Sequence, residues 1–133
     1  MDIRIGFGID VHRLEADIPL FIGGVQIPST FGAVGHSDAD VLLHALADAI
    51  LGAAGLRDIG HYFPNTDPTL KGIDSALIVK KALSEIAAKG WKVGNVDLVI
   101  GSETPIRIGT LKDQPYLHEL VGGDQKIQDF FKS

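Results

Sequence analysis

The 133-residue sequence contains no cysteine, which excludes disulfide bonds, thiolate metal sites and a cysteine nucleophile. Any transition metal would therefore be held by histidine and carboxylate side chains. No apolar run is long enough to span a bilayer. The first ten residues, MDIRIGFGID, lack the basic segment and apolar stretch of a signal peptide. We therefore expect no membrane partner and a cytoplasmic location in a bacterium, or the plastid stroma if a transit peptide has been removed.

Positive charge is also scarce, since 12 Lys and Arg residues face 17 Asp and Glu residues and give a formal net charge of −5. This balance argues against a nucleic-acid partner. It does not exclude an anionic small molecule, because a bound metal ion can reverse the local field. The composition is that of an ordinary globular protein, so we expect a single domain over residues 1–133. A chain of this size buries only a modest hydrophobic core of its own, which favours oligomerisation.

Apolar periodicity predicts strands that alternate with helices. In the first predicted strand the residues Ile3 to Val11 alternate, so that apolar side chains share one face. Gly55 and Gly90 stand where the two long predicted helices should stop. The predicted elements are strands at 2–12 and 91–100, a hairpin or a bulged strand pair at 18–28, helices at 38–54 and 73–89, and short helices at 116–121 and 124–131.

Three residues have the types and spacing of a catalytic zinc site. Asp10 and His12 are two apart, so on a strand they project from the same face, the one that lacks large apolar residues. At roughly 100° per residue, His44 lies almost opposite the apolar stripe of its helix, so we expect it to face a cleft or a partner chain. Catalytic Zn²⁺ is commonly held by three protein ligands. Asp48, one turn further, would orient His44 or make only a surface contact.

The start of the same helix has features of an anion site. Ser37 is the predicted N-cap, with Asp40 in the place of the usual capping-box glutamate. Free backbone N–H groups beside His36 and Ser37 would point at an anion. The segment 58–60, Asp-Ile-Gly, supplies a carboxylate and a tight turn. An isolated Asp-x-His pattern usually lies at the surface and has no function, and a polar helix face is usually only solvated. The metal-ligand pattern and the anion-binding features at the start of the helix together predict a metal-assisted site for a phosphorylated ligand.

Six segments between residue 4 and about residue 97 form one long and specific pattern: GFGIDVHRL, IGGVQIP, GHSDADVLLHALADAILGAAGLRDIGHYFP, NTDP, KGIDS and GNVD. In these segments the chain resembles the 2-C-methyl-D-erythritol 2,4-cyclodiphosphate synthase family. The resemblance implies a two-layer α/β sandwich, with one mixed sheet and helices on one face, in a homotrimer with shared active sites. It implies a lyase that converts 4-diphosphocytidyl-2-C-methyl-D-erythritol 2-phosphate to the 2,4-cyclodiphosphate and CMP, by attack of the 2-phosphate on the β-phosphate.

The resemblance also implies roles for single residues. Asp10, His12 and His44 match Zn²⁺ ligands, and Mg²⁺ or Mn²⁺ serves as a second metal in the family. His36 and Ser37 match residues that contact the substrate phosphates, and His36 is the catalytic residue expected to stabilise the transition state. The substrate-binding residues implied besides these two are Asp10, Val11, His12, Asp58, Ile59, Gly60, Phe63, Pro64, Asn65, Thr66 and Asp67.

Residues 101–133 depart from the family pattern. Ile106 stands where the family usually has lysine, and the family's TTE and GFxGR elements, which contact the cytidine diphosphate from the adjacent subunit, are absent. This departure favours one alternative, a metal-binding homologue with weak or no activity that binds a phosphorylated ligand. A second alternative is an unrelated zinc-dependent phosphoesterase, which the lack of further ligands for a dinuclear site disfavours.

Overall fold

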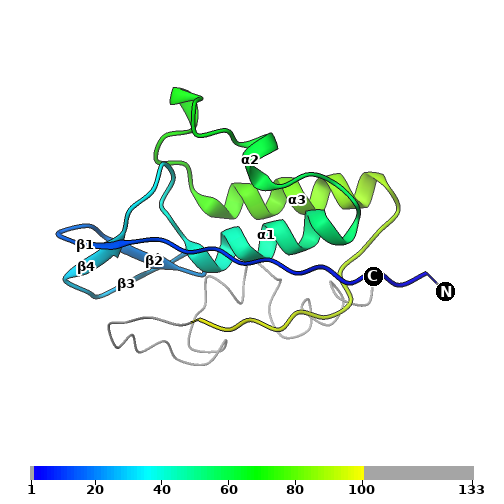
Figure 1. Ribbon diagram of the computed structural model, residues 1–133, viewed down its shortest axis with the longest axis horizontal. Coiled ribbons are helices and arrows are strands. Elements are labelled where there is room, and N and C mark those ends of the chain that lie inside the picture. The colour runs from blue at the N-terminus through cyan, green and yellow to red at the C-terminus, as the bar shows by residue number, and fades with distance from the viewer. Residues whose placement is uncertain (1, 101–133) are drawn as a thin grey trace.

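The structure is a computed structural model that describes residues 2–100, and it has a mixed α/β fold (Figure 1). Helices α1 (Val41–Ala53) and α3 (Ser75–Ala88) lie side by side and make the most extensive contact between elements. A short helix α2 (Ile59–Tyr62) and a 3₁₀ turn η1 (Pro68–Leu70) connect them. The helices predicted at 38–54 and 73–89 are thus confirmed. They begin three and two residues later than predicted, and each ends one residue earlier. No helix within residues 2–100 is both long and apolar enough to cross a membrane.

Two small antiparallel sheets lie beyond the N-terminal end of α1. One pairs β1 (Leu14–Ala16) with β4 (Phe31–Ala33), and the other pairs β2 (Leu20–Ile22) with β3 (Val25–Ile27). The β2–β3 pair is the predicted hairpin. Its two-residue turn has φ of 64° at Gly23 and 81° at Gly24, a left-handed conformation that favours glycine at both positions.

The carboxylate of Asp40 joins this hairpin turn to the start of α1. It accepts the backbone N–H groups of Gly23 at 3.0 Å and Gly24 at 2.6 Å, and it caps α1 by accepting from Leu43 at 3.1 Å. Asp40, and not Ser37, is therefore the N-cap. The Ser37 prediction is wrong because the chain turns at Ala39 through a φ of 57°, which delays the helix by one turn.

The core lies between α1, α3 and the β2–β3 hairpin. The predicted stripe of α1 is buried at Leu42, Leu46 and Ile50. Leu43 and Ala47, both 0% exposed, show that α1 is buried on a second face as well. The core residues on the other elements are Leu20, Ile22, Ile27, Ile78, Val79, Ala82 and Ile86.

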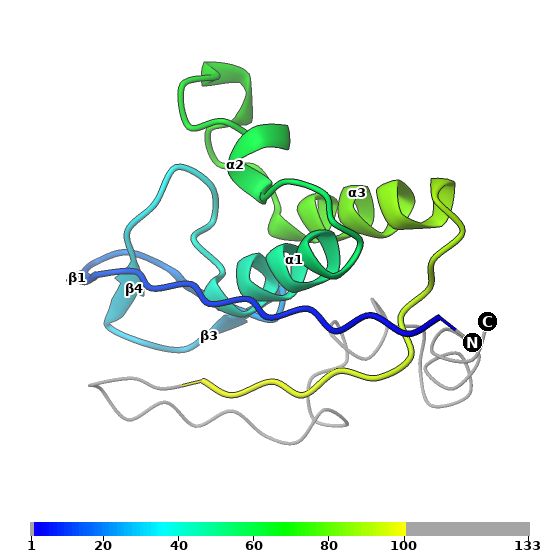
Figure 2. The same ribbon diagram turned by 45° about the vertical axis from the view of Figure 1, so that its right-hand side comes forward.

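Residues 2–12 run extended along α1 but are not part of a sheet within residues 2–100 (Figures 1 and 2). The glycine face of this segment, and not the apolar face, meets the helix. A Cβ atom at Gly6 would lie 1.9 Å from the carbonyl oxygen of Ala49, and one at Gly8 would lie 1.9 Å from that of Ala45. Only a bare backbone can approach a helix this closely.

The apolar face of the same segment points outward, with Ile5 92% exposed and Phe7 83% exposed. Residues 91–100 also run without a strand partner in the described part of the chain. The single mixed sheet predicted by the resemblance is thus not formed within residues 2–100, because neither long extended segment has a ladder partner there. The predicted helices at 116–121 and 124–131 lie outside the described residues.

Candidate metal centre

Asp10, His12 and His44 converge as the sequence predicts. One ligand atom from each lies within 4.8 Å of the others. Oδ2 of Asp10 is 2.8 Å from Nε2 of His12 and 3.2 Å from Nδ1 of His44, and the two imidazole rings meet edge to face with centroids 5.6 Å apart. The extended N-terminal segment supplies two of these side chains and α1 supplies the third. The close glycine contact between segment and helix brings them together.

The free lone pair of His12 faces the centre. Its Nδ1 lies 2.7 Å from the carbonyl oxygen of Val34, in the loop that follows β4. A carbonyl oxygen can only accept, so Nδ1 carries the proton and donates it. In the neutral ring the lone pair is therefore on Nε2, the nitrogen beside Asp10. A metal-binding histidine typically donates its other N–H in this way.

Two atoms of the centre are buried without a hydrogen-bond partner, namely Oδ2 of Asp10 and Nε2 of His12. Burial opposes ionisation of Asp10, but when the two rings are protonated, the hydrogen bond from His44 and the positive charges of His12 and His44 outweigh it and lower the pKa of this carboxyl group. Buried polar atoms left unpaired cost free energy, and a cation would satisfy both. The donor set of one carboxylate and two imidazoles fits a divalent metal such as Zn²⁺.

His44 is only 7% exposed, so the prediction that it faces a cleft or a partner chain is wrong. The N-terminal segment covers one side of its ring and α3 covers the other. Its Nε2 lies 3.0 Å from Oγ of Ser37 and 2.8 Å from Oγ of Ser75, the first residue of α3. Sequence reasoning gave Ser75 no role, although it ends the KGIDS segment that resembles the family.

Asp48 does not orient His44 by a hydrogen bond, as one reading of the sequence predicted. It accepts the backbone N–H of Ile59 at 2.9 Å instead. Burial, together with the charge of Asp58, raises the pKa of the Asp48 carboxyl group. The contact ties the helix that carries His44 to the predicted substrate segment 58–60. Within that segment Asp58 caps α2 by accepting from His61 at 3.1 Å, and its side chain is exposed.

His36 contacts the second predicted substrate segment. Its Nε2 donates to the backbone carbonyl of Asp67 at 3.0 Å, and its own carbonyl accepts from Gly72 at 2.7 Å. Hydrogen bonds from Thr69 lower the pKa of the Asp67 carboxyl group. The loop before α1 and the loop before α3 are therefore held together at His36.

Five other predicted substrate residues make no side-chain hydrogen bond or ring contact with the triad within residues 2–100. Val11 points away from its neighbours Asp10 and His12, with its side chain 82% exposed. No hydrogen bond or ring contact joins the triad to the residues that precede Asp67, which are Phe63, Pro64, Asn65 and Thr66.

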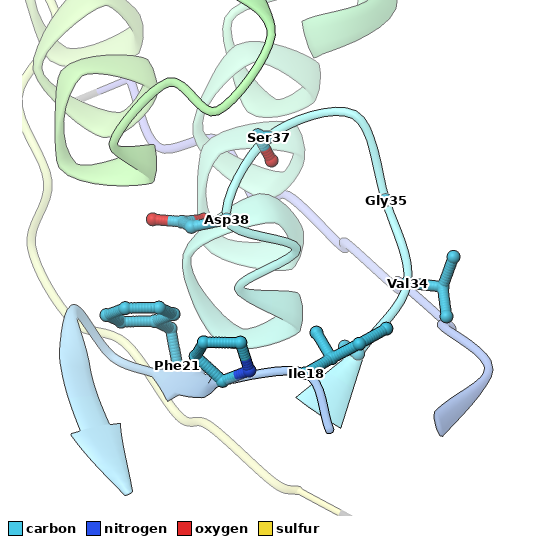
Figure 3. A pocket seen from close by; sticks show the side chains of 8 residues that line it. Ile18, Phe21, Val34, Gly35, Ser37 and Asp38 are labelled. Carbon is cyan, nitrogen blue, oxygen red and sulfur yellow. The ribbon is translucent and has the colours of Figure 1, made fainter. Parts of the chain in front are cut away.

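A cavity of about 220 Å³ opens beside the centre but contains none of its ligand side chains. Figure 3 shows Ile18, Phe21 and Val34 on its apolar side and Ser37 and Asp38 at its polar end. Val34 and Ser37 thus touch both the cavity and the histidines of the centre. The cavity therefore adjoins the candidate metal centre through Val34 and Ser37.

Residues 3–116 of the chain match the profile of the YgbB family. A protein of Porphyromonas gingivalis, named 2-C-methyl-D-erythritol 2,4-cyclodiphosphate synthase, is 53% identical over 102 residues, which are 77% of this chain and 63% of that protein. A protein of Bordetella avium with the same name is 55% identical over 102 residues, again 77% of this chain and 63% of its own length. The match to this chain therefore spans less than two thirds of these relatives.

Solved structures give the same likeness. A 2C-methyl-D-erythritol-2,4-cyclodiphosphate synthase in a CDP-bound form superposes with a TM-score of 0.74 and 40% sequence identity, covering 97% of this chain and 80% of that one. A CDP complex of IspF from Plasmodium falciparum gives a TM-score of 0.72 and 31% identity, covering 94% of this chain and 76% of its own.

Proposed function

The chain belongs to the YgbB family, and on this basis we propose that it is a 2-C-methyl-D-erythritol 2,4-cyclodiphosphate synthase of the non-mevalonate isoprenoid pathway. It converts 4-diphosphocytidyl-2-C-methyl-D-erythritol 2-phosphate to the 2,4-cyclodiphosphate and CMP. Relatives at 53% and 55% identity carry this name. The observation that carries the proposal is the convergence of Asp10, His12 and His44 at a partly buried site, where two of their buried atoms have no hydrogen-bond partner.

The proposed cofactor is Zn²⁺, held by Oδ2 of Asp10, Nε2 of His12 and Nδ1 of His44. When bound, the ion supplies positive charge that polarises the phosphate under attack. Mg²⁺ or Mn²⁺ is the proposed second metal. The closeness of the ligand atoms to one another supports the zinc assignment, as does their chemistry, since carboxylate and imidazole are common zinc ligands.

The protein's own residues bind and orient the substrate. No protein nucleophile is needed, because the substrate's 2-phosphate attacks its own β-phosphate, so catalysis is mainly positioning and charge neutralisation. Ser37 and His36 contact the phosphates, and His36 stabilises the transition state from a ring anchored on Asp67. Segments 58–60 and 63–67 hold the methylerythritol part. The Asp48–Ile59 hydrogen bond keeps the first of these at a fixed distance from α1.

The proposed assembly is a homotrimer with shared active sites. Its support is the exposed apolar face of residues 3–11, which in water would favour association. In the trimer this face packs against neighbouring subunits and the extended segments complete a two-layer sandwich with one mixed sheet. The location proposed is the bacterial cytoplasm or the plastid stroma. The exposed apolar side chains are Ile3, Ile5, Phe7, Ile9 and Val11.

A cytidine nucleotide is the proposed leaving part of the substrate. Similar solved structures are described as CDP complexes, which supports a nucleotide ligand for this chain. The residues expected to depart from the family's nucleotide motif, 101–133, lie outside the described structure. Their sequence is the reason to keep the alternative of a weakly active or inactive metal-binding homologue.

Release of CMP from the diphosphocytidyl substrate by zinc-loaded protein tests the proposal. We expect CMP and the cyclodiphosphate in equal amounts. Zinc binding without CMP release would favour the inactive homologue. Release of inorganic phosphate from simple phosphate esters would favour the phosphoesterase instead.

A further inference from the structure

Ser75 has a buried hydroxyl that the proposed function leaves without a role. It begins α3 and is 0% exposed. A hydroxyl buried between helices costs free energy unless it is hydrogen-bonded. Its Oγ lies 2.8 Å from Nε2 of His44 and in short contact with Oδ1 of Asp38. Ser75 therefore connects a metal ligand on α1 to a carboxylate in the loop before that helix.

The donor and the acceptor in each contact between Asp38, Ser75 and His44 follow from which of these groups can donate a proton. The carboxylate of Asp38 offers only acceptors. It accepts the backbone N–H of Ser75 at 2.9 Å and that of Asp40 at 3.1 Å. The Ser75 hydroxyl has one proton and gives it to Asp38. Its oxygen can then only accept, so His44 donates to it from Nε2.

The contacts of Ser37 are compatible with donation from Nε2 of His44. Its Oγ accepts the backbone N–H of Ala39 at 3.1 Å and lies 3.0 Å from Nε2 of His44. The Nε2 proton thus faces two hydroxyl oxygens. In the neutral ring Nδ1 keeps its lone pair and faces Oδ2 of Asp10 at 3.2 Å.

We propose that Ser75 is a positioning residue for the metal centre, whose hydroxyl is fixed by Asp38 and holds the His44 ring with its Nδ1 lone pair towards Asp10 and His12. The inference rests on the metal centre of the proposed function. His12 presents Nε2 because Val34 binds its Nδ1, and His44 presents Nδ1 because Ser75 binds its Nε2. Each histidine is set by an acceptor from a different part of the chain.

The alternative is that Ser75 only stabilises the N-terminal end of α3. Asp38 already binds its backbone N–H, and Asp74, the N-cap, accepts from Ala76 at 2.9 Å. Neither contact needs the hydroxyl. Ser75→Ala removes the hydroxyl and leaves both contacts in place. Ser84→Ala, at an exposed serine on the same helix, is the matched control.

The experiment measures Zn²⁺ affinity by competition with a chelator, for metal-free protein of each variant. We expect Ser75→Ala to weaken zinc binding about 10- to 100-fold, as loss of a partner to a metal-binding histidine typically does. Ser84→Ala should leave it unchanged, and Ser75→Thr, which keeps a hydroxyl, should recover most of the affinity. Unchanged affinity in Ser75→Ala, or equal loss in Ser84→Ala, would overturn the proposal.

Long-range ¹H–¹⁵N spectra of metal-free protein, recorded where the ring is neutral, test the same idea without zinc. We expect the wild-type His44 proton on Nε2, with its signal exchange-broadened in Ser75→Ala. A wild-type proton on Nδ1 would overturn the proposal even if the variants fail to fold. A wild-type chain that binds no zinc but shows the Nε2 proton would refute the metal centre and leave the orienting contact standing.

Discussion

The carboxylate of Asp48 accepts the backbone N–H of Ile59 at 2.9 Å, which joins the helix of His44 to the loop of Asp58. Asp48→Ala should therefore loosen segment 58–60 and leave the triad intact. We expect binding of the cyclodiphosphate to weaken by on the order of 1–3 kcal/mol, the range for a lost hydrogen bond to a charged group. Asp48→Asn keeps an oxygen acceptor and should lose less. Calorimetric titration with zinc content measured in parallel checks this, and unchanged affinity in Asp48→Ala would refute it.

The metal centre should lose zinc when any of its ligands is removed. We expect about one Zn²⁺ per wild-type chain and strongly reduced zinc in Asp10→Ala, His12→Ala and His44→Ala, because two remaining ligands hold the ion poorly. Metal analysis of purified protein measures this. His61→Ala, an exposed histidine on α2, is the control and should keep its zinc. Full occupancy in all three ligand variants would rule out the assignment.

His36 should affect turnover and not metal content. His36→Ala removes the ring together with its contact to the Asp67 carbonyl, and the transferring phosphate loses the imidazole proposed to stabilise it. We expect the loss of transition-state stabilisation to be roughly 2–4 kcal/mol, as for other preorganised donors. Steady-state kinetics of CMP release, with zinc content as the control, measures it. An unchanged kcat would show that His36 only holds the loops together.

The stability of the metal-free protein should depend on pH through Asp40. Burial raises the pKa of this carboxyl group, against the lowering effect of its backbone donors. Between the unfolded pKa of roughly 3.9 and the raised folded pKa, the folded state holds the proton more tightly, so stability falls as pH rises. The free energy of unfolding of the wild type relative to Asp40→Asn should therefore fall with rising pH.

Urea denaturation of the metal-free wild type and Asp40→Asn from acid to neutral pH measures this difference. Since asparagine does not titrate, the pH dependence that comes from this group is absent from the variant. A difference that stays constant, or that grows with pH, would contradict the raised pKa.

The exposed apolar face should drive assembly. Ile5 is 92% exposed, so Ile5→Asp costs little within one subunit but buries a charge in the proposed trimer. Sedimentation equilibrium should show a wild-type trimer and a smaller species for Ile5→Asp. Leu77→Asp, at a half-exposed leucine on α3, is the control and should stay trimeric. A wild-type monomer at micromolar concentration would contradict the assembly.

Local patterns predicted the two long helices and the hairpin. Helical spacing of apolar residues marked α1 and α3, and Gly55 and Gly90, with φ of 70° and 82°, end them as expected. The pair Gly23-Gly24 indicated the turn between β2 and β3. The N-cap of α1 was missed because the left-handed turn at Ala39 has no sequence signal, as alanine rarely adopts it.

Contacts between distant segments were harder to predict. The alternation in residues 2–12 was recognised, but the face that meets α1 was not, because glycines pack there by backbone approach and not by apolar area. The triad could be named from residue types and spacing. The hydrogen-bond partner of His44 could not be predicted, because Ser75 lies 31 positions away and no sequence pattern distinguishes it from other serines.

The glycine contact between the N-terminal segment and α1 makes the proposed metal centre sensitive to substitutions at residues that are not ligands. An added methyl group at Gly6 or Gly8 would lie 1.9 Å from a helix carbonyl oxygen, so the segment would have to move away. Asp10 and His12 follow directly on this segment and would move with it. A random-mutagenesis screen for loss of zinc should therefore recover substitutions at two positions that have no side chain and touch no metal.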